Sequence, residues 1–128
     1  MRFTYQLDGD PQQLRALRQA LDDWPQVNPA LVDDLLIVTN ELASNALTYG
    51  LPAIQVAVAA FPTQIRIQVI QTSSGAGSGP VPRMIKEPGL RGRGLALVNT
   101  LSREWGWLQR GQEVVVWAVL ALPGNLSQ

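Results

Sequence analysis

The segment Val38–Gly50, VTNELASNALTYG, decides the fold of this 128-residue chain. Apolar residues recur at intervals of three and four from Leu31 to Ala46, a pattern that predicts a long helix with one buried side. Glu41 and Asn45 lie four positions apart at the edge of that side, so their side chains project in the same direction. An oxygen pair of this kind suits a hard cation such as Mg²⁺. Polar pairs at this spacing also occur on ordinary amphipathic helices, and spacing alone does not separate the two interpretations.

The composition is typical of one globular domain with a core of its own, because 46% of the residues are hydrophobic and 16% are charged. Ten basic and ten acidic residues cancel, so the overall charge favours direct binding neither to nucleic acid nor to a membrane surface. The chain has no cysteine and no histidine, which excludes disulfides, thiolate chemistry and the usual zinc ligands. No stretch has the length and hydropathy of a signal peptide or a membrane span, and we therefore expect a cytoplasmic protein.

The sequence predicts five strands from the alternation of apolar and polar residues. It predicts three helices, the long helix included, from apolar residues at helical spacing and from capping residues at helix starts. The strands are expected over 2–7, 53–60, 64–71, 104–109 and 113–122, and the helices over 11–23, 29–49 and from 95 onward. The first strand is expected at an edge of the sheet. Neighbouring strands with helices that cover one face predict an α+β two-layer sandwich with a mainly antiparallel mixed sheet.

A glycine-rich segment over 72–89, TSSGAGSGPVPRMIKEPG, separates the second half of the chain from the first. Long segments without periodicity tend to be functional lids or binding loops, although a flexible linker is the alternative. Gly92 and Gly94 then precede a helical run and are flanked by Arg91 and Arg93. Backbone N–H groups at a helix start, with arginines beside them, form a site for an anion such as phosphate. An ordinary tight turn would have the same glycine spacing.

Taken in order, the N-E-L-x-x-N-A helix, the strand pair, the glycine-rich loop and G-R-G-L-x-L-V resemble the ATP-binding domain of the GHKL (Bergerat-type, histidine-kinase-like) ATPases. Within that superfamily, NELASNALTYG and RGRGLALVNTLSREWG look most like the bacterial anti-sigma-factor serine/threonine protein kinases, over about 29–122. The resemblance implies one histidine-kinase-like ATPase domain over 1–128 with a lid-type loop at about 72–90. It further implies ATP and Mg²⁺ as cofactors and a sigma factor and/or an anti-sigma antagonist protein as partners. It is compatible with a homodimer, although no residue pattern requires one.

The resemblance also assigns roles to single residues. Glu41 matches the glutamate that acts as general base in the family's kinases, and Asn45 matches the asparagine that coordinates Mg²⁺. Gly92, Gly94 and Leu95 match the second glycine box, whose backbone approaches the nucleotide phosphates. Together with the neighbouring arginines, the expected cofactor-binding residues are Asn45, Gln71, Arg91, Gly92, Arg93, Gly94 and Leu95.

Two departures from the family pattern concern the nucleotide base. Gln71 stands where the family has an aspartate that accepts the adenine amino hydrogen, and Val114-Val115 replaces a polar pair. A glutamine carbonyl still accepts that hydrogen, and losing the charge costs about 1 kcal/mol, roughly five- to tenfold in affinity. Two functions therefore stay open. One is an ATP-using anti-sigma-type kinase, and the other is a non-catalytic partner-binding module of the same fold with weak or no nucleotide binding.

Overall fold

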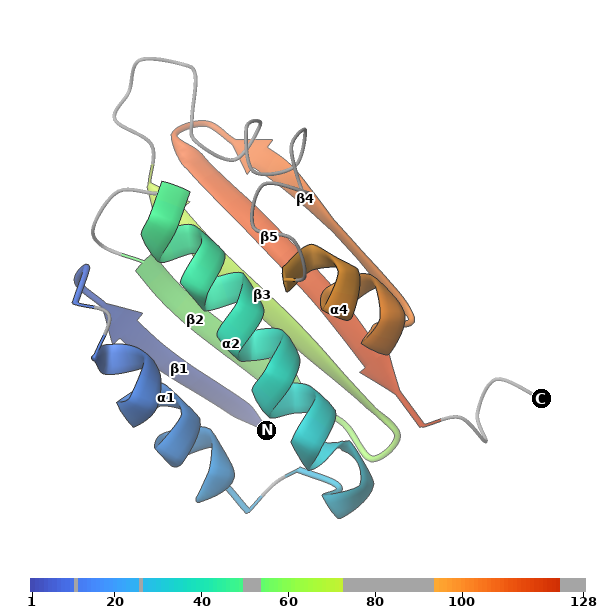
Figure 1. Ribbon diagram of the computed structural model, residues 1–128. Helices are drawn as coiled ribbons and strands as arrows, with labels where there is room; N and C mark the ends of the chain where they lie inside the picture. The colour runs from blue at the N-terminus through green and yellow to red at the C-terminus, as the bar shows by residue number, and fades with distance from the viewer. Residues whose placement is uncertain (11, 26, 50–53, 73–93, 123–128) are drawn as a thin grey trace.

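The computed structural model of the chain describes residues 1–10, 12–25, 27–49, 54–72 and 94–122. In chain order the elements are β1 (Arg2–Leu7), α1 (Gln13–Asp22), the short 3-10 helix η1 (Pro29–Leu31), α2 (Val32–Tyr49), β2 (Ile54–Ala60), β3 (Gln64–Thr72), α4 (Gly94–Leu101), β4 (Glu104–Arg110) and β5 (Glu113–Ala121). Figure 1 shows two layers, with α1, α2 and α4 on one face of the sheet. The predicted α+β sandwich is confirmed.

The described strands form one five-stranded sheet in the order β1-β2-β3-β5-β4. All four pairings between these neighbours are antiparallel. The strand 2–7 lies at an edge of the sheet, as its alternation predicted, and β4 forms the other edge. The last hairpin folds back so that β5, not β4, pairs with β3, and this register places Thr72 opposite Glu113.

The core lies between the sheet and the helices because one side of each element is apolar. On β2, Ile54, Val56 and Val58 are almost fully buried, and the residues between them are partly exposed. On α2, Leu35 and Leu42 are each 1% exposed. Burying one such side chain contributes roughly 1.5–3 kcal/mol, so the face that α2 presents to the sheet dominates the stability of this layer.

Residues at the helix starts explain why α1 and α2 both begin later than the sequence predicted. Asn28 Oδ1 accepts a hydrogen bond of 2.9 Å from the backbone N–H of Ala30, so Pro29–Leu31 forms a 3-10 turn before α2 begins. Asp10 accepts from the backbone N–H of Gln12 through its carboxylate and from that of Gln13 through its carbonyl, both at 2.9 Å. These bonds form a turn, so α1 begins at Gln13 and not at residue 11.

No helix in the described ranges has both the length and the hydropathy needed to cross a membrane.

Candidate functional site

The helix α2 is the element around which the candidate site is arranged. It packs against β2, β3 and β5 below it and against α1 and α4 beside it. In Figure 1, α1 and α4 lie on opposite sides of α2. The figure also shows that α2 and β3 both finish at the end of the sheet where β5 begins, in agreement with the pairing of Thr72 with Glu113.

Glu41 and Asn45 lie on the side of α2 that is turned toward α4. Their neighbour Asn40 lines a hollow together with residues of α1, so it marks the α1 side of the helix. An α-helix turns by about 100° per residue, so around the axis of α2 Glu41 lies about 100° and Asn45 about 140° from Asn40. This rotation crosses the exposed surface of α2 and ends on the flank opposite Asn40. Asn45 is 5% exposed and Glu41 is half-buried. A carboxylate and an amide therefore lie at the border between the core and the space beside α4.

Gln71 continues the inward side of β3, after Ile67 and Val69. In the sheet it lies between Ile54 of β2 and Val114 of β5. It is 2% exposed, and its Oε1 has no hydrogen-bond partner among the residues that the structure describes. An unpaired buried amide oxygen costs about 1–3 kcal/mol, so this oxygen is a candidate contact for a bound group.

The two valines that replace the family's polar pair lie on different faces of β5. Val114 belongs to the core cluster on the helix side and pairs with Gln71. Val115 is its neighbour in the strand, so its side chain points to the other face of the sheet. Only Val114 is therefore placed to affect a group bound near Gln71, and it adds an apolar surface there.

The helix α4 begins at Gly94, close to the position that the glycine pattern predicted. The N-terminal end of α4 is the end nearer α2 (Figure 1). Val98 is fully buried and anchors the helix, and Trp105 Nε1 of β4 donates a hydrogen bond of 3.1 Å to Asn99 Oδ1. Leu95 lies in the first turn of α4, and its side chain is not among the described ones.

Other predicted site residues fall outside the described part of the chain. Arg91, Gly92 and Arg93 belong to the range 73–93, as does nearly all of the expected lid at 72–90. Asn45 lies one turn before the end of α2 and Gln71 one residue before the end of β3, and these two elements finish at the same end of the fold, with α4 packed beside α2.

Two buried hydroxyl groups were not singled out by the sequence. Thr39 is fully buried in α2, and its Oγ1 has no hydrogen-bond partner within the described ranges; the same holds for Ser102 Oγ after α4. A threonine inside the apolar stripe between Val38 and Leu42 is the signal that could have identified Thr39. No comparable signal marks Ser102.

A second feature that the sequence did not indicate is a hollow of about 610 Å³ between α1 and α2. Its lining residues are Gln12, Leu14, Arg15, Arg18 and Asn40. Both arginines are exposed, and neither forms an ion pair with any residue in the described ranges. Their spacing of three on α1 places both guanidinium groups along one side of that helix.

The family model of the histidine kinase-like ATPase domain matches residues 7–120. The chain belongs to this family. Two solved structures are similar to it in fold. The first contains the RsbU and RsbW domains of Rv1364c from Mycobacterium tuberculosis, with a TM-score of 0.68 and 18% identity over 95% of this chain and 32% of that one. The second is the Acinetobacter baumannii histidine kinase AdeS, with a TM-score of 0.52 and 12% identity over 94% of this chain and 68% of that one.

The chain thus spans about a third of the first of these structures. At such low identities the similarity concerns the fold alone. A search of curated proteins finds no match.

A histidine kinase-like ATPase domain implies a magnesium-bound nucleotide, and the described residues can be compared with the ligands that such a nucleotide needs. Within the described ranges, no group of three or more carboxylates gathers that could hold a metal ion. Mg²⁺ often uses only one or two protein oxygens and takes its other ligands from water and phosphate, so a site with the amide oxygen of Asn45 as its one protein ligand is compatible with this ion. Gln71 Oε1, which has no partner in the described part of the chain, has the chemistry to accept a hydrogen from an adenine amino group. The residues fit the cofactor that the family implies.

Proposed function

We propose that this chain binds Mg-ATP between the Asn45 flank of α2 and the start of α4, with the base held near Gln71. The observation that carries the proposal is the nearly complete burial of Gln71, whose Oε1 has no partner among the described residues, at the end of the sheet where α2 also finishes. A buried acceptor without a protein partner is destabilising, and a ligand donor would satisfy it. Asn45 on the same end supports the proposal, because an amide oxygen is a normal Mg²⁺ ligand.

The roles of the individual residues in this proposal follow the family resemblance. Asn45 would hold Mg²⁺, Gln71 the base, and Arg91, Gly92, Arg93, Gly94 and Leu95 the phosphates. Bound Mg-ATP supplies a transferable γ-phosphoryl group. Glu41, one turn before Asn45 on the same flank, would accept the proton of a serine or threonine hydroxyl on a protein substrate. The hydroxyl oxygen would bond to the γ-phosphorus while the bond from that phosphorus to the β,γ-bridging oxygen breaks and ADP leaves.

We further propose that the chain is a cytoplasmic anti-sigma-type regulator, with a sigma factor and/or an antagonist protein as partners. The sequences NELASNALTYG and RGRGLALVNTLSREWG support this part, because they look most like the bacterial anti-sigma kinases. The hollow between α1 and α2 supports a protein partner as well. Two arginines without ion pairs in the described ranges would attract an acidic segment, and Leu14 adds apolar contact area.

A second candidate function is a partner-binding module that no longer uses nucleotide efficiently. The observation that favours it is the pairing of Gln71 with Val114, because a neutral amide beside an apolar residue holds a base less strongly than a carboxylate beside a polar one.

A thermal melt of the purified chain separates the nucleotide-binding function from the partner-binding module. Under the first function, millimolar Mg-ATP raises the melting temperature, because a ligand that binds only the folded state stabilises it. An unchanged melt at tens of millimolar Mg-ATP would contradict the first function and support the second.

A further inference from the structure

The side chain at position 71 differs from a carboxylate in a way that affects which base it accepts. A carboxylate is only an acceptor, whereas a glutamine amide has an acceptor, Oε1, and a donor, Nε2–H. Gln71 is 2% exposed, and Oε1 has no partner among the described residues. No hydrogen bond from those residues to this oxygen therefore fixes which end of the amide faces a ligand.

The two purines present opposite patterns on their Watson–Crick edges. Adenine has a donor at its 6-amino group and an acceptor at N1, whereas guanine has an acceptor at O6 and a donor at N1–H. An amide pairs with either pattern, because a half-turn about its last torsion exchanges the oxygen and the nitrogen. A carboxylate has only acceptors, so it forms one bond to the adenine amino group and then faces the adenine N1 acceptor, whereas guanine offers it two adjacent donors, N1–H and the 2-amino group.

The surroundings of Gln71 do not create a preference for adenine. Its neighbours across the sheet, Ile54 and Val114, are apolar and 1% exposed, so they offer neither a donor nor an acceptor side chain. Gln68, the other amide near this end of β3, is three positions from Gln71 and therefore lies on the opposite face of the sheet. Of these described side chains in the sheet, only Gln71 therefore offers hydrogen-bonding groups to the base.

We propose that Gln71 makes this base site accept adenine and guanine nucleotides about equally. The inference rests on the proposed nucleotide binding and names its substrate class as purine nucleoside triphosphates in general. Wild-type protein binds Mg-ATP and Mg-GTP with dissociation constants within about fivefold of each other, because each base forms the same two hydrogen bonds. The Gln71→Glu variant, which keeps the side-chain length but has only acceptors when ionised, binds Mg-GTP at least about tenfold more tightly relative to Mg-ATP, because guanine offers it two donors and adenine offers one.

Isothermal titration calorimetry at about pH 8, where a free carboxyl group is ionised, tests the proposal. Mg-ATP and Mg-GTP are titrated into the full chain as wild type, as Gln71→Glu and as Gln68→Glu. The last variant adds the same charge to the opposite face of the same strand and keeps the wild-type ratio. Circular dichroism melts establish that each variant is folded, and the wild-type ratio decides the proposal if Gln71→Glu does not fold.

The outcomes separate this proposal from the one on which it rests. A wild-type protein that binds Mg-ATP but binds Mg-GTP more than about fivefold more weakly overturns the purine tolerance and leaves nucleotide binding intact. A folded Gln71→Glu variant with the wild-type ratio overturns the assignment to Gln71. Absence of binding for both nucleotides overturns the proposed function and this inference together.

Discussion

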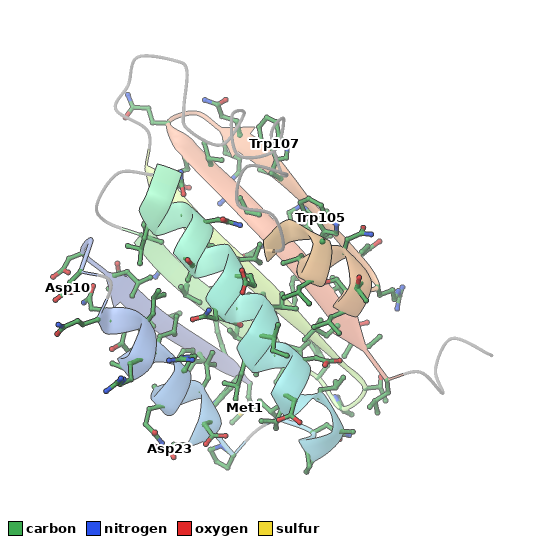
Figure 2. All side chains as sticks on the ribbon, in the orientation of Figure 1. Met1, Asp10, Asp23, Trp105 and Trp107 are labelled. Atoms are coloured by element: carbon green, nitrogen blue, oxygen red, sulfur yellow. The ribbon has the colours of Figure 1, made fainter. Side chains whose placement is uncertain are left out.

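Trp105 Nε1 on the edge strand β4 donates a hydrogen bond of 3.1 Å to Asn99 Oδ1 on α4. Figure 2 shows Trp105 beside α4. In the described residues, α4 is joined to the rest of the molecule by this bond, by Val98 in the core and by its packing on α2 and β4. The bond therefore helps to hold the helix whose first residue, Gly94, belongs to the proposed phosphate site.

We expect Asn99→Ala to lower the free energy of unfolding by about 0.5–1.5 kcal/mol, the net contribution of one hydrogen bond. Urea unfolding followed by far-UV circular dichroism measures the change. Asn99→Asp is the matched control, because it keeps an acceptor oxygen for the indole N–H. Equal unfolding midpoints for wild type and Asn99→Ala would show that the bond does not contribute.

Asn45→Ala should remove the rise in melting temperature that Mg-ATP produces, because the variant lacks the proposed Mg²⁺ ligand. The fold should survive, since Asn45 lies at the border of the core. Differential scanning fluorimetry with and without millimolar Mg-ATP measures the shift. Asn40→Ala is the control, because it removes an amide from the α1 side of the same helix. If Asn45→Ala keeps the full shift, the metal-ligand role is wrong.

Glu41→Gln should keep the Mg-ATP-dependent shift and abolish phosphoryl transfer, because the amide cannot accept the proton of the attacking hydroxyl. Transfer of radiolabelled phosphate from ATP to an antagonist protein purified from the native cell measures the activity. Glu104→Gln, which removes an exposed carboxylate from β4, is the control and should keep it. Transfer at the wild-type rate by Glu41→Gln would exclude Glu41 as the general base.

Reversing the charges at Arg15 and Arg18 should weaken binding of a sigma factor or antagonist partner by at least about tenfold, because both guanidinium groups line the hollow between α1 and α2. Surface plasmon resonance at two salt concentrations measures the affinity. The affinity of the wild type should fall more steeply with salt than that of the charge-reversed variant. Arg66→Glu is the control, because it reverses the charge of an exposed arginine on β3. Unchanged affinity after both reversals would place the partner on another surface.

Gly106→Ala should destabilise the fold by about 1–3 kcal/mol, because a Cβ there would lie 3.0 Å from Cζ2 of the Trp117 ring. Chemical denaturation measures the cost. The double variant with Trp117→Leu tests the cause, because a smaller side chain leaves room for the added methyl group. A cost that persists unchanged in the Trp117→Leu background would show that contact with the ring is not responsible.

The sequence by itself determined the elements, because their signals are local. Alternation identified Arg2–Leu7, apolar spacing identified the helix that carries Glu41 and Asn45, and the glycine pattern identified the start of α4 near Gly94. The direction in which a helical side chain points depends only on the rotation of about 100° per residue along the helix. That Glu41 and Asn45 share one flank of the helix could therefore be predicted without tertiary information. The boundary of α1 was less exact, because the hydrogen bonds of Asp10 form a turn before the helix.

Only the tertiary structure decided which strands are neighbours. The insertion of β5 between β3 and β4 places Val114 beside Gln71 and sends Val115 to the other face, and no local pattern contains that pairing. The hollow that joins Arg15 and Arg18 to Asn40 likewise needs the packing of α1 against α2. The physical reason is that the pairing of strands and the packing of helices are set by contacts between residues far apart in the chain. The periodicity of apolar residues in one segment indicates only which of its own side chains face the core and which face solvent.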